Sequence, residues 1–185
     1  MVKDPLPPTT RELAAGPCRG PRADRPFMPG YGVLPPDQGS GLIPWAEAER
    51  RLTVANDYWC ATVRPDGRPH VTPVWGVWLD GGVWFSSGLR SRKARDLAVE
   101  PRCTLTTDDA QNPVVVDGVA RQVTDPAGIA AFLDAMNAKY HSGMTVEFLD
   151  PQVNGTFAVR PERAFALTHD DFTGSPTRWR FPPSA

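Results

Sequence analysis

Residues 86–95 read Ser-Ser-Gly-Leu-Arg-Ser-Arg-Lys-Ala-Arg and carry the chain from an apolar strand into a basic helix. Ser91 suits the N-cap position of that helix, where free backbone N–H groups and the helix dipole favour an anion. Arg92 can hold two phosphate oxygens at once, and Lys93 adds a movable point charge. The segment therefore predicts a phosphate site. The alternative is a basic helix face that only contacts water.

Strands are expected on both sides of this segment. The β-prone runs before it are separated by Pro-Asp-Gly-Arg and Asp-Gly-Gly turns, which predicts an antiparallel meander. Pro101 ends the basic helix, and two further strands follow it. The expected strands cover residues 58–64, 69–79, 82–86, 102–107 and 113–123.

Two other helices are marked by their first residues. Pro44 begins a short helix over residues 44–52, and Asp125 with Pro126 fits the start of a second one. That second helix has one apolar packing face, made by Ile129, Phe132, Leu133 and Met136. Tyr140 and His141 follow its expected end and could supply a proton donor, although exposed residues of these types usually have no such role.

The last strands are expected around Pro161-Glu162. Residues 155–160 and 163–168 flank this dipeptide and are β-prone, which predicts an antiparallel pair that closes a small barrel. The tail beyond them contains Arg178 and Trp179. A Trp beside Arg can stack on a ring, and the alternative is a hydrophobic plug that ties down the end of the chain.

Composition narrows the function classes. The chain has 185 residues, 41% of them hydrophobic, and a net charge of −1, which fits one domain with a substantial core. That charge gives no general attraction to nucleic acid or to an anionic membrane, and no apolar run could cross one, so neither partner is expected. Three widely spaced cysteines fit a reducing cytoplasm and, with three scattered histidines, give no metal-binding pattern.

The N-terminal segment differs from the rest of the chain. Residues 1–44 hold 10 of the 21 prolines and show no sustained periodicity. We expect residues 1–43 to form a largely disordered or draped arm, and residues 44–185 to form a single domain.

The second strand offers a place for a flat ring. Its alternation predicts that Val71, Pro73 and Trp75 face the core, while Thr72 and Gly76 lie on the other side. Gly76 removes a side chain where a ring could approach, and neighbouring backbone groups could bind the polar edge of a pyrimidinedione. A β-bulge is an equally good explanation of this glycine.

Taken in order, these motifs resemble the pyridoxamine 5'-phosphate oxidase-like superfamily of split β-barrels, which bind flavins or deazaflavins. The resemblance covers residues 45–181 and rests on Asp66 to Trp75, Phe85 to Ser87, Ser91 to Leu97 with Pro101-Arg102, and Thr177 to Phe181. It implies a mainly β fold with a few flanking helices, an antiparallel six-stranded barrel of Greek-key type.

The same resemblance implies three groups of cofactor contacts. The ring would lie along Thr72, Pro73, Val74 and Trp75. The phosphate would meet Ser91, Arg92 and Lys93, with Ser86 and Ser87 beside it. The tail with Arg178 and Trp179 would complete the pocket. Catalytic side chains are not assigned.

Departures from the family pattern guide the choice of reaction. Oxidases of this family proper are expected to carry a Lys near the end of the ring-contacting strand, close to Gly76 here, and an Arg-x-His motif near the C-terminus, and this chain has neither. The Pro-Val-Trp and Thr-Arg-Trp segments look more like the branch that uses 8-hydroxy-5-deazaflavin, coenzyme F420. The resemblance therefore implies an oxidoreductase that transfers hydride from reduced F420 to a small unsaturated or aromatic acceptor.

Two alternatives stay open at this point. One is an FMN-dependent oxidase or reductase, and the other is a non-catalytic carrier of flavin, F420 or haem. The resemblance also implies a homodimer with the cofactor near a two-fold interface.

Overall fold

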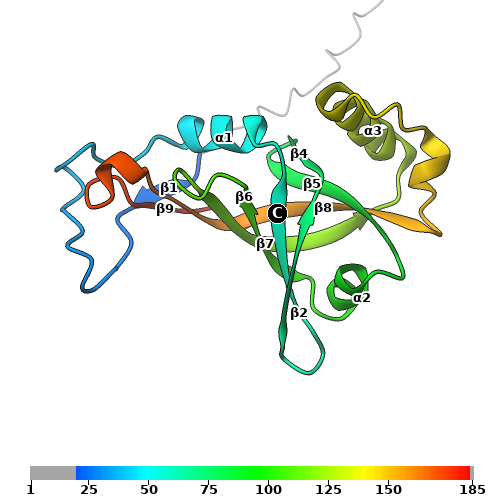
Figure 1. Cartoon of the computed structure of the whole chain (residues 1–185), viewed down its shortest axis with the longest axis horizontal. Helices are drawn as coiled ribbons and strands as arrows, with labels where there is room; N and C mark the ends of the chain where they lie inside the picture. The colour runs from blue at the N-terminus through cyan, green and yellow to red at the C-terminus, as the bar shows by residue number, and fades with distance from the viewer. Residues whose placement is uncertain (1–19, 184–185) are drawn as a thin grey trace, which may run out of the picture.

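The computed structural model describes residues 20–183, in which nine strands form one antiparallel sheet with three α-helices around it (Figure 1). The strands are β1 (Arg22–Asp24), β2 (Tyr58–Val63), β3 (Pro69–Val74), β4 (Gly76–Leu79), β5 (Gly82–Gly88), β6 (Arg102–Thr107), β7 (Val114–Val123), β8 (Asn154–Ala166) and β9 (Thr177–Arg180). The helices are α1 (Trp45–Val54), α2 (Arg92–Val99) and α3 (Pro126–Tyr140), with 3-10 turns at Val146–Leu149 and His169–Asp171.

The order of the strands shows a barrel that is split and not closed. From one end the sheet runs β3-β2-β6-β7-β8, and β8 then pairs with β5, which pairs with β4. Within the described residues β3 pairs only with β2 and β4 only with β5, so the sheet opens between them at Trp75. The expected antiparallel split barrel is confirmed. The single strand expected over residues 69–79 and the closed barrel are wrong.

The two strands expected around Pro161 are one continuous strand. β7 pairs with β8 along the whole length of β7, and the register shifts between Asp117 and Gly118, where Pro161 lies opposite Gly118. Glu162 is the extra residue of this bulge. Proline cannot donate a ladder hydrogen bond, so a bulge tolerates it, and at Gly118 a Cβ atom would clash with the Arg160 carbonyl. Pro161-Glu162 therefore bends the strand and does not reverse it.

Part of the predicted arm belongs to the sheet. β1 pairs with β9, with Ala23 opposite Trp179, and so forms an edge that the sequence did not predict. Arg25 ties the following loop to the C-terminal segment by donating to the Pro176 carbonyl at 2.6 Å. The part of the arm over residues 1–19 lies outside the described residues.

Helix starts follow their capping residues. The Asp125 carboxylate accepts from the Gly128 N–H at 2.7 Å, so α3 begins where predicted. Its buried Ile129, Phe132 and Met136 pack over β4, separately from the main core inside the sheet. α3 continues through Tyr140, which corrects the expectation that Tyr140 lies in a loop. No helix in the described part of the chain is long and apolar enough to span a membrane.

The faces of β3 are the reverse of the prediction. Val71 is 54% exposed and Trp75 is 53% exposed, and Pro73 between them is exposed too. Val74 is buried in the core instead. Alternating apolar residues on a strand indicate that one face of the strand is buried. The alternation does not indicate whether the chain's own core or another protein surface buries that face.

Candidate functional site

The turn between β5 and α2 is built by short hydrogen bonds. The Ser91 Oγ accepts from the Ala94 N–H at 3.2 Å, which confirms the predicted N-cap, and lies 2.8 Å from the Ser87 Oγ. The Leu89 N–H donates to the Val153 carbonyl, which fixes the turn to the loop before β8. The helix start is therefore held rigidly, with two hydroxyl groups beside it. This arrangement suits an anion.

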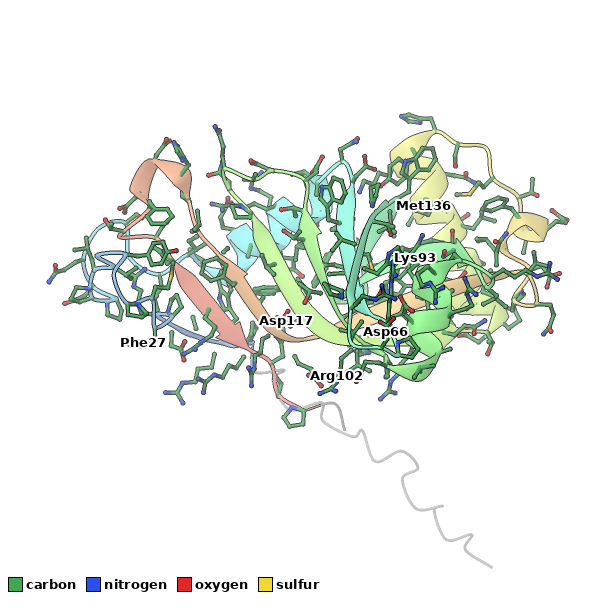
Figure 2. All side chains as sticks on the ribbon, turned by 60° about the horizontal axis from the view of Figure 1, so that its bottom comes forward. Phe27, Asp66, Lys93, Arg102, Asp117 and Met136 are labelled. Atoms are coloured by element: carbon green, nitrogen blue, oxygen red, sulfur yellow. The ribbon has the colours of Figure 1, made fainter. Side chains whose placement is uncertain are left out.

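Two cations follow the cap on the first turn of α2. Arg92 is partly exposed and places its guanidinium 3.8 Å from the Asp96 carboxylate, one turn along the helix. Asp96 is fully buried and accepts from the Thr62 hydroxyl at 3.1 Å. Lys93 is half-buried and lies on the half of the molecule away from Phe27 (Figure 2). Because the Arg92–Asp96 contact is long, the guanidinium keeps donors for a ligand.

The ring segment predicted at residues 72–75 lies on an open strand edge. β3 has β2 on one side and no strand partner on the other among the described residues, so one row of its backbone N–H and C=O groups is available. The Oγ1 of Thr72 is buried without a hydrogen-bond partner from residues 20–183. A planar ligand with polar edges would satisfy both features.

β2 contacts both α2, through Thr62 and Asp96, and the strand β3. Cys60 on β2 lies opposite Thr72 on β3. Its thiol pKa is held below the ordinary range, first by a hydrogen bond with Cys103 and then by the positive charge of Lys93, against the effect of burial. The helix α2, which carries Lys93, packs against β2, where Thr62 donates to Asp96. Ser86, opposite Thr156 on β8, and Ser87 complete the polar end of β5.

Arg178 and Trp179 lie far from the Ser91 turn in the structure. β9 places Arg178 opposite Phe165, whereas Ser87 is opposite Gly155 at the other end of β8. Ten residues at about 3.3 Å each separate the two positions by up to roughly 30 Å. The structure thus does not bring these tail residues to the Ser91 turn of the same chain.

Both tail side chains have structural partners. Trp179 is completely buried and packs edge-on against Trp45 at 5.4 Å. Arg178 donates to the Asp24 carboxylate at 2.8 Å. Trp179 fits the alternative of a hydrophobic plug.

A further polar cluster was missed by the sequence analysis. Lys139 and Tyr140, the last two residues of α3, reach the backbone of Gly76 at the opening of the sheet. Gly76 was the only indication of this cluster in the sequence, because a missing side chain allows another group to approach the backbone. No local sequence pattern identifies Lys139 and Tyr140 as the groups that approach it. The hydroxyl of Tyr140, which the sequence suggests as a proton donor, makes hydrogen bonds with the main chain of Gly76 and Asn56.

Across residues 20–183, no three His, Cys, Asp or Glu side chains are grouped as metal ligands. The arrangement can hold an anion at the Ser91 turn and a flat polar ring along the edge of β3. These are the two binding functions that a phosphorylated ring cofactor needs.

Comparisons with known proteins concern the family and the fold of the chain. The sequence model of a family described as pyridoxamine 5'-phosphate oxidase matches residues 45–167. No curated protein sequence matches the chain significantly.

Three similar solved structures share the fold. A structure described as an F420 reductase is 25% identical over 63% of this chain and 94% of its own, with a TM-score of 0.52. A conserved hypothetical protein from Mycobacterium tuberculosis is 22% identical over 77% and 91%, with a TM-score of 0.61. The haem storage protein HutZ from Vibrio cholerae is 22% identical over 66% and 91%, with a TM-score of 0.53.

Proposed function

The chain belongs to the pyridoxamine 5'-phosphate oxidase family, and from this premise we propose that it is an oxidoreductase that transfers hydride from reduced coenzyme F420 to a small unsaturated or aromatic acceptor. The observation that carries the proposal is the rigid, doubly cationic helix start at Ser91, joined through β2 to the open edge of β3. When bound, the deazaflavin supplies the hydride chemistry.

The chain's own residues bind and orient in this proposal. Arg92 and Lys93 neutralise the phosphate, while Ser87 and Ser91 offer hydroxyl groups beside it. The edge of β3 and the Thr72 hydroxyl meet the polar edge of the ring. No side chain is assigned to proton transfer. The unpaired, buried Cys60 and Cys103 fit the cytoplasmic location that accompanies the proposal.

We prefer coenzyme F420 over FMN because the structure described as an F420 reductase is 25% identical to this chain. FMN carries a phosphate and a similar ring, so it fits the same residues and is the second candidate. A haem carrier is the third, and the likeness to HutZ, at 22% identity, supports the fold alone.

The cofactor is tested by titrating purified protein separately with coenzyme F420, FMN and haemin, with absorption and fluorescence as readouts. We expect saturable binding of F420, weaker binding of FMN and no specific haemin spectrum. Rapid reoxidation of bound reduced F420 on adding acceptors would support an enzyme, and unchanged reoxidation would support a carrier. Tight binding of haemin alone would contradict the proposal.

A homodimer is part of the proposal. Trp59 and Val63 on β2, Val71 on β3 and Trp75 directly after β3 form an outward apolar row, each 44–54% exposed. The ring segment lies on this row and is open to solvent in one chain, so a second copy would provide the wall that a ring site needs. The row would also explain why β3 turns its apolar side outward.

Trp59→Asp should weaken the dimer by about tenfold or more, because it places a charge in an apolar contact. Analytical ultracentrifugation at micromolar concentrations measures the change. Phe27→Asp is the matched control, since Phe27 is 87% exposed and lies at the end of the molecule away from Asp66, which is in the β2–β3 turn (Figure 2). A wild-type monomer that binds cofactor at full affinity would rule out the dimeric site.

A further inference from the structure

The C-terminal end of α3 closes the opening between β3 and β4 with two side chains. The Lys139 Nζ donates to the Gly76 carbonyl at 2.7 Å. The Tyr140 hydroxyl accepts from the Gly76 N–H at 2.9 Å and donates to the Asn56 carbonyl at 2.7 Å. Both polar backbone groups of Gly76 are thus satisfied by α3, at the position where the sheet has no strand to satisfy them.

Tyr140 also determines how Trp75 lies. The two rings stack at 4.6 Å between centroids and are inclined by only 4°. Trp75 is nevertheless 53% exposed. One indole face is therefore held by Tyr140, while much of the side chain stays open next to the ring segment of β3.

Gly76 permits this close arrangement. A Cβ at this position would lie 2.8 Å from the Trp84 carbonyl oxygen and 3.1 Å from the Tyr58 ring. The backbone of Gly76 therefore lies close against β5 on one side and against Tyr58 on another. The residues of α3 bind its remaining N–H and C=O groups. The conformation at Trp75–Gly76 depends on side chains 63 and 64 residues away in sequence.

The charge of Lys139 is sensitive to its surroundings. Its ammonium group lies 5.0 Å from the Tyr58 ring centre and 4.9 Å from the Tyr140 ring centre. Burial lowers the pKa of Lys139 to about 8, against the opposing effects of the Asp57 and Asp108 carboxylates. Burial also raises the pKa values of Tyr58 and Tyr140, so both phenols stay neutral in this range. Lys139 is the group of this cluster that changes charge near pH 8.

We propose that Lys139 and Tyr140 are positioning residues of the ring site, which hold Gly76 and the Trp75 indole in the arrangement that the bound ring meets. The identity of the ring rests on the proposed function, whereas the hold on Trp75 is a property of the chain itself. The two parts can be measured separately.

The hold on Trp75 is tested without any ligand. Protein labelled with 5-fluorotryptophan gives a ¹⁹F resonance for Trp75, which Trp75→Phe identifies. We expect this resonance to shift with a midpoint near pH 8 in the wild type and to lose that shift in Lys139→Met, which keeps the apolar stem without the charge. Tyr140→Phe, which keeps the stacked ring, should move the resonance at all pH values.

The effect on the site is tested with FMN and coenzyme F420 as probes. Tyr140→Phe and Lys139→Met should each weaken binding by about fivefold to tenfold, the loss typical of one or two positioning hydrogen bonds. Ile129→Val is the matched control, because Ile129 is buried at the other end of α3. It should lower the melting temperature slightly and leave both the resonance and the affinities unchanged.

Each outcome decides a different part. A Trp75 resonance that is identical in the wild type, Lys139→Met and Tyr140→Phe would overturn the hold on Trp75. A changed resonance with unchanged cofactor affinity would overturn the positioning role. If the wild type binds neither cofactor, the proposed function fails and the positioning role fails with it. A Trp75 resonance that still responds to pH and to both substitutions would then show that the contacts of Lys139 and Tyr140 exist, and that only the proposed ligand is wrong.

Discussion

Trp179→Ala should lower the free energy of unfolding by about 3–5 kcal/mol, the usual cost of removing a fully buried large aromatic side chain. Trp179 has no exposed surface, and its ring packs edge-on against Trp45. The substitution would leave a cavity between α1 and β9 that the flanking strands cannot fill. Urea unfolding monitored by circular dichroism measures the change, with folded protein verified at low temperature.

Arg178→Ala provides the comparison on the same strand. Its ion pair with Asp24 is partly exposed, so the expected loss is below about 1 kcal/mol. Cofactor affinity should stay the same in both variants if the tail serves the core of its own chain. If the Trp179→Ala protein has normal stability but binds cofactor more weakly, Trp179 belongs to the binding site.

Arg92→Ala and Lys93→Ala should each weaken cofactor binding by about 1.5–3 kcal/mol, which is roughly 10-fold to 150-fold. Each removes a charge-assisted contact from the first turn of α2, where the Ser91 cap presents the helix N-terminus. Fluorescence titration with F420 and FMN measures the loss. The melting temperature of the protein without ligand should change little, because Arg92 is exposed and Lys93 makes no hydrogen bond or ion pair within residues 20–183.

Arg95→Ala is the matched control for the two cations. It removes the same charge from an exposed position of the same helix, one turn beyond the cap. If all three variants lose affinity equally, the effect is general electrostatic attraction and the phosphate site is not at the helix start. If only Arg92→Ala and Lys93→Ala lose affinity, the local site is supported.

Local chemistry explains which features the sequence could predict. The caps at Ser91 and Asp125 were predictable because a side-chain oxygen and a backbone N–H three residues away form a self-contained unit. The Ser91 turn is of this kind, because its cap and the neighbouring Ser87 hydroxyl come from one short segment. The break between β3 and β4 could not be predicted in this way. The two strands separate at Trp75, where α3 takes the hydrogen bonds of Gly76, and no residue near Gly76 in the sequence indicates that α3 will do so.

Long-range pairing explains the remaining errors. Pro161-Glu162 looks like a turn in isolation, and it is a bulge because Gly118 lets β7 lie close against the bend. Likewise, the Thr-Arg-Trp ending suggested a ligand contact, yet the pairing of β9 with β8 buries Trp179. In both cases the outcome depends on a partner strand that sequence spacing does not reveal.

The β1–β9 pair has a consequence for aggregation. Without β1, β9 would present an unpaired edge next to a large tryptophan, and such edges recruit strands from other chains. Asp24 at this edge holds Arg178, and the hydrogen bond from Arg178 keeps the pKa of the Asp24 carboxyl below its usual value. The ion pair therefore contributes above the ordinary carboxyl pKa of about 4 and is lost as the pH falls through the lowered value. The short strand β1 thus shields the β9 edge from strand pairing with other chains, and acid weakens the ion pair that helps to hold β1 there.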